Sequence, residues 1–141
     1  MMMERAQRGG NMTDDMGIFR TRVGVESLTA RGTVQFVDNV MVDTGSELTW
    51  LPAPLLESMG IRREKTVRFR MADGNIVTRE TGYVIVHAGG AEVPDEVVFA
   101  LPGDLALLGA RSIEGLNFKV DLANKEFVAA GPMPAAGPQL V

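Results

Sequence analysis

Alternating hydrophobic and polar residues divide the first part of the chain into short segments typical of β-strands. Phe19 to Val25 carries Phe, Thr or Val at every second position, which predicts a half-buried strand. Residues 33–37 and 40–42 flank Asp38-Asn39, a dipeptide typical of turns. We therefore expect these two segments to form a hairpin that leads the chain into Asp43.

The pattern then changes to a short helix and returns to strands. The apolar run over 48–51 predicts a short strand that ends at Pro52. Residues 54–60 begin with Pro and end with Gly, the usual limits of a short helix. Residues 66–71 alternate again, and Asp73-Gly74 is the strongest short-range hairpin signal in the chain.

The second half continues as strands, turns and one more short helix. Asn75 to about His87 predicts a long strand, which Gly89-Gly90 turns back. The remaining expected elements are strand 91–93, a separate strand from Val97, helix 110–115, and a hairpin of 118–122 with 127–129 across Asn124-Lys125. Short strands joined by Gly and Pro turns favour an all-β fold, closed or sandwiched.

Length and composition indicate one folded domain with a tail at each end. The chain has 141 residues, 45% hydrophobic and 23% charged, which is close to the average for globular proteins. We expect a flexible N-terminal tail over 1–15, a folded domain over 16–130 and a flexible Pro- and Gly-rich tail over 131–141.

Charge and residue counts exclude several classes of function. A net charge of −4 with no basic stripe argues against nucleic-acid binding. No cysteine and a single histidine, interpreted as a strand-end residue (His87), leave no basis for a metal site, a disulfide or a serine triad. No apolar run approaches the ~20 residues of a membrane span, and the N-terminus is unlike a secretory signal. We expect a soluble cytoplasmic protein, or a soluble domain of a larger one, with no membrane partner.

The candidate chemistry lies in the Asp-Thr-Gly-Ser sequence, which occurs once in the chain. Asp43 follows the apolar run Val40-Met41-Val42 and precedes Thr44, Gly45 and Ser46. A carboxylate in a half-buried turn can hold a proton or orient a water molecule. Gly45 has no side chain to prevent another backbone from approaching.

This sequence resembles the active-site motif of aspartic proteases, and the chain is similar to the retropepsin-type family of retroviral proteases and their bacterial relatives. The similarity extends from about Phe19 to Val128. Its three anchors, in the order of the family, are Val42 to Ser46, the hairpin at Ala72-Asp73-Gly74, and Leu107-Leu108-Gly109 before a short helix. The resemblance implies a retropepsin-like closed β-barrel with one or two short helices. Because the family uses two facing carboxylates, it also implies a homodimer.

The resemblance assigns a role to each matching residue. Asp43 would pair with Asp43 of a second copy and activate a water molecule, without metal or cofactor, to hydrolyse a peptide or protein substrate. Thr44 would bond across the two-fold axis, the Gly45 backbone would contact substrate, and Leu108 and Gly109 would pack beneath the motif. The flap over the substrate would comprise Met71, Ala72, Asp73, Gly74 and Asn75.

Further expectations concern pH, assembly and specificity. Retroviral members usually have Ala where this chain has Ser46, and a hydroxyl donating to the dyad would lower its pKa values and give an acidic optimum. An Arg111–Glu47 ion pair stays an open guess, because Ala110 separates Arg111 from Gly109. Subunits would pair through segments 19–25 and 118–128. Apolar substrate-pocket residues would include Met71, Ile76, Leu105 and Leu107.

Simpler interpretations stand beside these. Asp43 alone could be a turn cap, Trp50 and Phe99 core residues, and the acids Asp95, Glu96 and Asp104 solvated turn residues. A phosphoryl-transfer aspartate is set aside, because neither a second Asp nor a Lys stands next to Asp43. The remaining alternative to an active endopeptidase is a catalytically inactive retropepsin-like domain for dimerisation or peptide binding.

Overall fold

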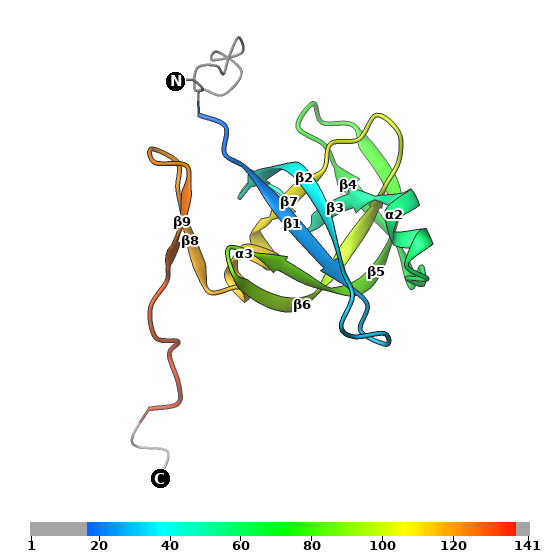
Figure 1. Ribbon diagram of the computed structural model, residues 1–141. Helices are drawn as coiled ribbons and strands as arrows, with labels where there is room; N and C mark the ends of the chain where they lie inside the picture. Colours follow the sequence, from blue (N-terminus) through cyan, green and yellow to red (C-terminus); the bar gives the residue numbers. More distant parts are fainter. Residues whose placement is uncertain (1–16, 138–141) are drawn as a thin grey trace, which may run out of the picture.

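Six strands form a closed barrel in the computed structural model, which describes residues 17–137 (Figure 1). Around the barrel these are β1 (Arg20–Glu26), β2 (Val34–Asp43), β7 (Leu107–Gly109), β3 (Thr49–Pro52), β6 (Ala91–Ala100) and β5 (Ile76–Ala88). Pairing of Gly24–Glu26 in β1 with Ile85–His87 in β5 closes the ring. The prediction of an all-β closed barrel is confirmed.

The other elements lie outside this ring. β4 (Lys65–Arg70) extends the sheet beyond β5. β8 (Phe118–Asp121) and β9 (Glu126–Ala129) form a separate two-stranded sheet beside the barrel (Figure 1). Within residues 17–137 two short helices, α2 (Ala53–Ser58) and α3 (Ala110–Gly115), follow β3 and β7 directly, as expected from the sequence.

The barrel interior is filled by β-branched, leucine and phenylalanine side chains. The most completely buried include Val23, Val25, Val40, Leu51, Leu56, Val84, Val86, Val97, Phe99 and Leu108. A second cluster contains Leu48, Trp50, Val98 and Ala100, against which pack Phe69, Met71, Val77 and Leu107. Trp50 and Phe99 are core residues, as expected. The second cluster connects β4 and β5 to the strand after Asp43.

The hairpin expected around Asp38-Asn39 is wrong, because these residues form a bulge within the continuous strand β2. Pairing with β1 runs from Val23↔Val37 to Thr21↔Val40, so two residues of β2 lie opposite Arg22. Asn39 has a φ of 59°, a conformation that Asn tolerates better than most residues. The extra residue bends the strand without reversing it, because β1 pairs with β2 on both sides of the bulge.

The break expected between 91–93 and Val97 is also wrong, because β6 continues through Pro94. Pro94 pairs with Ile85 on the β5 side. On its other side β6 pairs with β3 only from Val97 onward. Pro94 therefore lies where β6 is an edge strand, and the missing N–H removes no hydrogen bond to β3.

The turns agree with the local sequence. Gly89 and Gly90 have φ values of 59° and 82° and join β5 to β6. The N-terminal tail expected over 1–15 lies outside the described residues, and 131–137 contain no helix or strand. The tail boundaries stay a prediction. Among residues 17–137, no helix is long and apolar enough to cross a membrane.

Candidate active site

Asp43 is the last residue of β2 and is half-buried where the chain turns out of the barrel. Its Oδ1 accepts a hydrogen bond from the Gly45 N–H at 2.9 Å, and its carbonyl accepts one from the Ser46 N–H at 3.1 Å. A Cβ at position 45 would lie 3.2 Å from Asp43 Oδ1. Glycine at this position therefore lets the carboxylate lie close over the turn.

The loop after Asp43 rests directly on the start of α3. Gly109 pairs with Asp43 in the parallel register of β2 and β7, and buried Leu108 pairs with Val42. The Ala110 N–H donates to the Ser46 carbonyl at 2.7 Å. A Cβ at Gly109 would lie only 2.3 Å from the Leu48 carbonyl oxygen. The structure thus brings Leu108 and Gly109 together with the Asp43–Ser46 turn.

A buried chain of hydroxyl groups supports this contact and was not predicted from the sequence. The Gly109 N–H donates to Thr49 Oγ1 at 3.0 Å, and Thr49 Oγ1 lies 2.6 Å from Ser112 Oγ. Ser112 Oγ donates in turn to Asp95 Oδ2 at 2.8 Å. Thr49 and Ser112 are fully buried. The residues lie up to 63 positions apart, so no local pattern could have connected them.

The acids expected to be solvated turn residues have structural partners. Asp95 and Glu96 lie within strand β6, and Glu96 is buried. Thr81 Oγ1 donates to Glu96 at 2.7 Å, and Lys65 and Arg111 each lie 3.4 Å from its carboxylate. Asp104 does lie in a turn, but it is mostly buried and paired with Arg79. The expectation was wrong because their partners come from strands β4 and β5 and from α3, which are distant in the sequence.

The Met71–Asn75 loop closes the hairpin of β4 and β5, as expected from Asp73-Gly74. The Met71 N–H donates to the Asn75 carbonyl at 2.8 Å, and the Gly74 N–H donates to the Met71 carbonyl at 2.9 Å. Gly74 has a φ of 88°. Ala72 to Asn75 are exposed, whereas Met71 packs against the second cluster beside Leu48 and Leu107. The base of this loop therefore lies next to the strand that follows Asp43.

The hydrogen bond expected from Ser46 to Asp43 is wrong. Ser46 Oγ donates to the Leu48 carbonyl at 2.8 Å, two residues further along the chain. Asp43 instead receives its hydrogen bond from the Gly45 backbone. The Ser46 hydroxyl therefore does not support an acidic optimum. The Arg111–Glu47 pair has a separation of 3.9 Å between exposed side chains, so it contributes little to stability.

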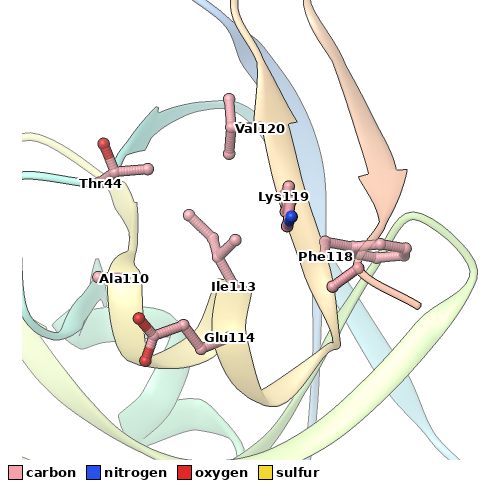
Figure 2. Close-up of a pocket in the computed structure, with 8 residues that line it drawn as sticks. Thr44, Ala110, Ile113, Glu114, Phe118, Lys119 and Val120 are labelled. Carbon is pink, nitrogen blue, oxygen red and sulfur yellow. The ribbon is translucent and has the colours of Figure 1, made fainter. Parts of the chain in front are cut away.

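Thr44 is exposed and borders a cavity of about 490 Å³ (Figure 2). Figure 2 shows Thr44 on one side of this space and the β8 side chains of Lys119 and Val120 on the other, with Ile113 of α3 between them. The cavity wall is mostly apolar around Ile113, Phe118 and Val120, with Glu114 and Lys119 as its charged residues.

One group of side chains in the described region has the composition of a metal site. Glu26, His87 and Glu92 offer ligand atoms within 4.8 Å of one another. His87, at the end of β5 as expected, has Nε2 2.8 Å from Glu26 Oε1. Arg31 already contacts both carboxylates, through Nε to Glu26 at 2.9 Å and Nη2 to Glu92 at 3.1 Å. The guanidinium supplies the positive charge that a metal would bring, and these residues lie at the far end of β2 from Asp43.

A closed six-stranded barrel with two short helices and a single Asp-Thr-Gly turn at a strand end defines a retropepsin-like protomer. Residues 26–116 match the family model described as "Aspartyl protease", which is more than half of the chain. The chain belongs to this aspartyl protease family.

Solved structures of foamy-virus proteins resemble the chain. The simian foamy virus (mac) protease is 21% identical, with 67% of this chain and 91% of that chain covered and a TM-score of 0.46. Two structures of the foamy viral protease-reverse transcriptase also match over 67% of this chain. One is in complex with double-stranded DNA (19% identity, 15% of that chain, TM-score 0.45) and one with an RNA/DNA hybrid (18% identity, 12% of that chain, TM-score 0.46). No curated protein matches the chain.

Proposed function

We propose that the chain is an aspartic endopeptidase that acts as a homodimer, with one active site formed by Asp43 of both copies. The observation that carries the proposal is the position of Asp43. It lies half-buried at the end of β2, its carboxylate is oriented by the Gly45 N–H, and its Asp-Thr-Gly motif occurs once in the chain. One such carboxylate per chain supports a site shared between two chains.

The reaction follows from two facing carboxylates. At a separation of about 3 Å they cannot both ionise, so they share one proton and titrate as a coupled pair. The ionised carboxylate removes a proton from a water molecule held between the two groups. The protonated carboxylate donates to the scissile carbonyl oxygen while the water oxygen attacks the carbon, which gives a tetrahedral intermediate. The C–N bond of this intermediate then breaks as the leaving nitrogen takes up the proton that the first carboxylate removed from the water. The Gly45–Asp43 hydrogen bond fixes the direction of each carboxylate.

Two surfaces support the proposed dimer. Exposed Thr44 lies beside Asp43 and borders the 490 Å³ cavity, where a second copy would lie. The β8–β9 hairpin is a separate two-stranded sheet that packs beside the barrel through Phe118 and Phe127, and its outer edges are offered for pairing. The segment 19–25 is less suited to pairing than expected, because β1 already pairs with β2 and, over Gly24–Glu26, with β5. We therefore assign inter-subunit pairing to the β8–β9 hairpin.

An extended peptide is the proposed substrate. The Met71–Asn75 loop would act as the flap, adding backbone hydrogen bonds along the peptide, while side-chain pockets choose the sequence. Ile76 and Leu105 are exposed, and Met71 and Leu107 are half-buried. An apolar lining of this kind favours bulky apolar residues beside the cleaved bond.

The test compares wild type with Asp43→Asn on a mixed peptide library between about pH 4 and 6, a range around the ordinary pKa of a carboxyl group. Cleavage by wild type alone, with activity per chain rising with protein concentration, is the expected result. Cleavage by Asp43→Asn would indicate a contaminating protease. If wild type binds peptides or dimerises without cutting, the inactive binding domain is the correct alternative.

A further inference from the structure

Arg79 and Asp104 form a bidentate ion pair between the β4–β5 hairpin, which carries the proposed flap, and the loop before β7. Arg79 Nε donates to Asp104 Oδ2 at 2.7 Å, and Nη2 donates to Oδ1 at 2.9 Å. Their side chains are only 16% and 11% exposed. Paired donors on a carboxylate fix orientation as well as distance, and partial burial reduces screening by solvent.

The Asp104 end of this pair is rigid. Residues 101–104 form a tight turn in which the Asp104 N–H donates to the Leu101 carbonyl at 2.9 Å. The Leu101 N–H donates back to Asp104 Oδ2 at 2.8 Å. Pro102 and Gly103, the latter with a φ of 94°, occupy the two central positions, as a type II turn requires. The carboxylate therefore moves only if the whole turn moves.

The Arg79 end belongs to the hairpin that carries the flap. Arg79 lies three residues after Ile76, where β5 begins, and pairs with Val67 of β4. Its guanidinium carbon lies 5.9 Å from the centroid of the Trp50 ring, and Trp50 contacts Phe69 of β4. Arg79 is thus held against the second cluster.

Exposed apolar side chains lie on both elements that the pair connects. Ile76 belongs to the flap hairpin, and Leu101 and Leu105 flank the turn; they are 41%, 43% and 63% exposed. The 101–106 loop lies beside the strand of Asp43, because the Met41 N–H donates to the Ala106 carbonyl at 3.1 Å. Leu107 pairs with Met41 two positions before Gly109 pairs with Asp43. A peptide side chain next to the cleaved bond would therefore meet these apolar residues.

We propose that the Arg79–Asp104 pair is a latch that holds the flap hairpin and the 101–106 loop at the spacing that selects substrates with a bulky apolar residue beside the cleaved bond. This inference rests on the proposed endopeptidase function. The two residues are positioning residues and take no part in proton transfer. Hydrogen bonds from Arg79 lower the pKa of the Asp104 carboxyl below its ordinary value of 3.8, so the latch stays ionised in the peptide assay.

The test measures kcat and KM for two peptides that differ only in Leu or Ala beside the cleaved bond. For Asp104→Asn and Arg79→Gln, KM for the Leu peptide should rise about tenfold, while kcat stays within about threefold of wild type. The preference for Leu over Ala should fall about tenfold, because the variants lose the positioning of the apolar residues and not a group that takes part in the reaction. Arg79→Lys keeps the charge but not the paired donors and should lie between wild type and Arg79→Gln.

The matched control is Arg63→Gln. Arg63 also bonds two carboxylates, Glu57 and Glu80, and lies over an aromatic ring, that of Phe99. It connects α2 to β5 and not the flap to the 101–106 loop, so its loss should leave the Leu preference unchanged. An unchanged preference in the Asp104 and Arg79 variants, or an equal loss in Arg63→Gln, would overturn the latch.

A second measurement separates the latch from the proposed function. Trp50 is the only tryptophan of the chain and lies beneath Arg79, so its fluorescence reports on the latch without catalysis. In folded Asp104→Asn the emission should shift, and amides of 65–79 should exchange hydrogen about tenfold faster through more frequent local opening. If wild type cuts no peptide, the proposed function fails, and these two readouts still decide the latch. Spectra and exchange identical to wild type would refute it.

Discussion

Replacing Gly109 by Ala tests whether the start of α3 sets the position of Asp43. The Gly109 φ of −94° suits alanine, so the substitution acts through space alone. The added Cβ would lie 2.3 Å from the Leu48 carbonyl oxygen and 2.9 Å from the Ser46 carbonyl oxygen, both in the backbone of the loop that follows Asp43. Ordinary contact begins near 3.4 Å, so the loop must move by about 1 Å.

A displacement of this size has a predictable cost. Overpacking of this kind destabilises a protein by about 1–3 kcal/mol. Misplacing a catalytic group by about 1 Å can lower the rate about a hundredfold. We therefore expect kcat/KM of Gly109→Ala to fall about a hundredfold in a peptide-cleavage assay below the melting temperature, with the folded state retained.

Gly82→Ala is the matched control. Its Cβ would also lie 2.3 Å from a backbone carbonyl oxygen, that of Arg62, but its other nearest neighbours are Phe99 and Ile61 and not the loop that follows Asp43. It should lose similar stability in thermal unfolding, with kcat/KM reduced by less than about threefold. Equal losses of activity in the two variants, or full activity in Gly109→Ala, would refute the idea that this contact positions Asp43.

Three further predictions concern stability and are checked by denaturant unfolding. Hydrogen bonds from the Arg31 side chain, the Gly32 N–H and His87 lower the pKa of Glu26 from 4.5 to about 2. The stability that this group contributes is therefore present above pH 4.5 and is lost as the pH falls toward 2. Glu26→Gln should make the free energy of unfolding depend less on pH in this range, and an unchanged pH dependence would exclude Glu26 as its source. Leu51→Ala, at a fully buried position, should cost about 2–5 kcal/mol, and a loss below 1 kcal/mol would contradict the packing. Thr49→Val leaves the buried Gly109 N–H without an acceptor and should cost about 1–3 kcal/mol; wild-type stability would show that this hydrogen bond is replaceable.

Local chemistry explains what the sequence predicted correctly. The Asp73-Gly74 and Gly89-Gly90 turns need residues that tolerate positive φ, and such residues are visible in the sequence. The short helix over Ala110–Gly115 was predicted from its composition and from Gly115, which is its last residue. The Asp-Thr-Gly-Ser motif is also a continuous stretch, so its place at a strand end followed from the apolar run before it.

Most of the errors and omissions came from distant contacts, and one came from a local choice of hydrogen-bond acceptor. Asp38-Asn39 has the composition of a turn, yet pairing with β1 on both sides makes it a bulge. Ser46 donates to Leu48 and not to Asp43, a choice of acceptor that composition does not encode. The Thr49–Ser112 and Arg79–Asp104 contacts join positions 63 and 25 residues apart. Only the folded arrangement of the strands and α3 brings these groups together.

The central claim is that each active site needs Asp43 from two chains, and mixing subunits tests it most directly. Wild type and Asp43→Asn are mixed in equal amounts, allowed to exchange subunits, and assayed at constant total chain concentration. If both carboxylates are required, only pairs of wild-type chains cut, and activity should fall to about one quarter of that of pure wild type. Activity at about one half would mean that each wild-type chain acts independently, and it would contradict the shared site.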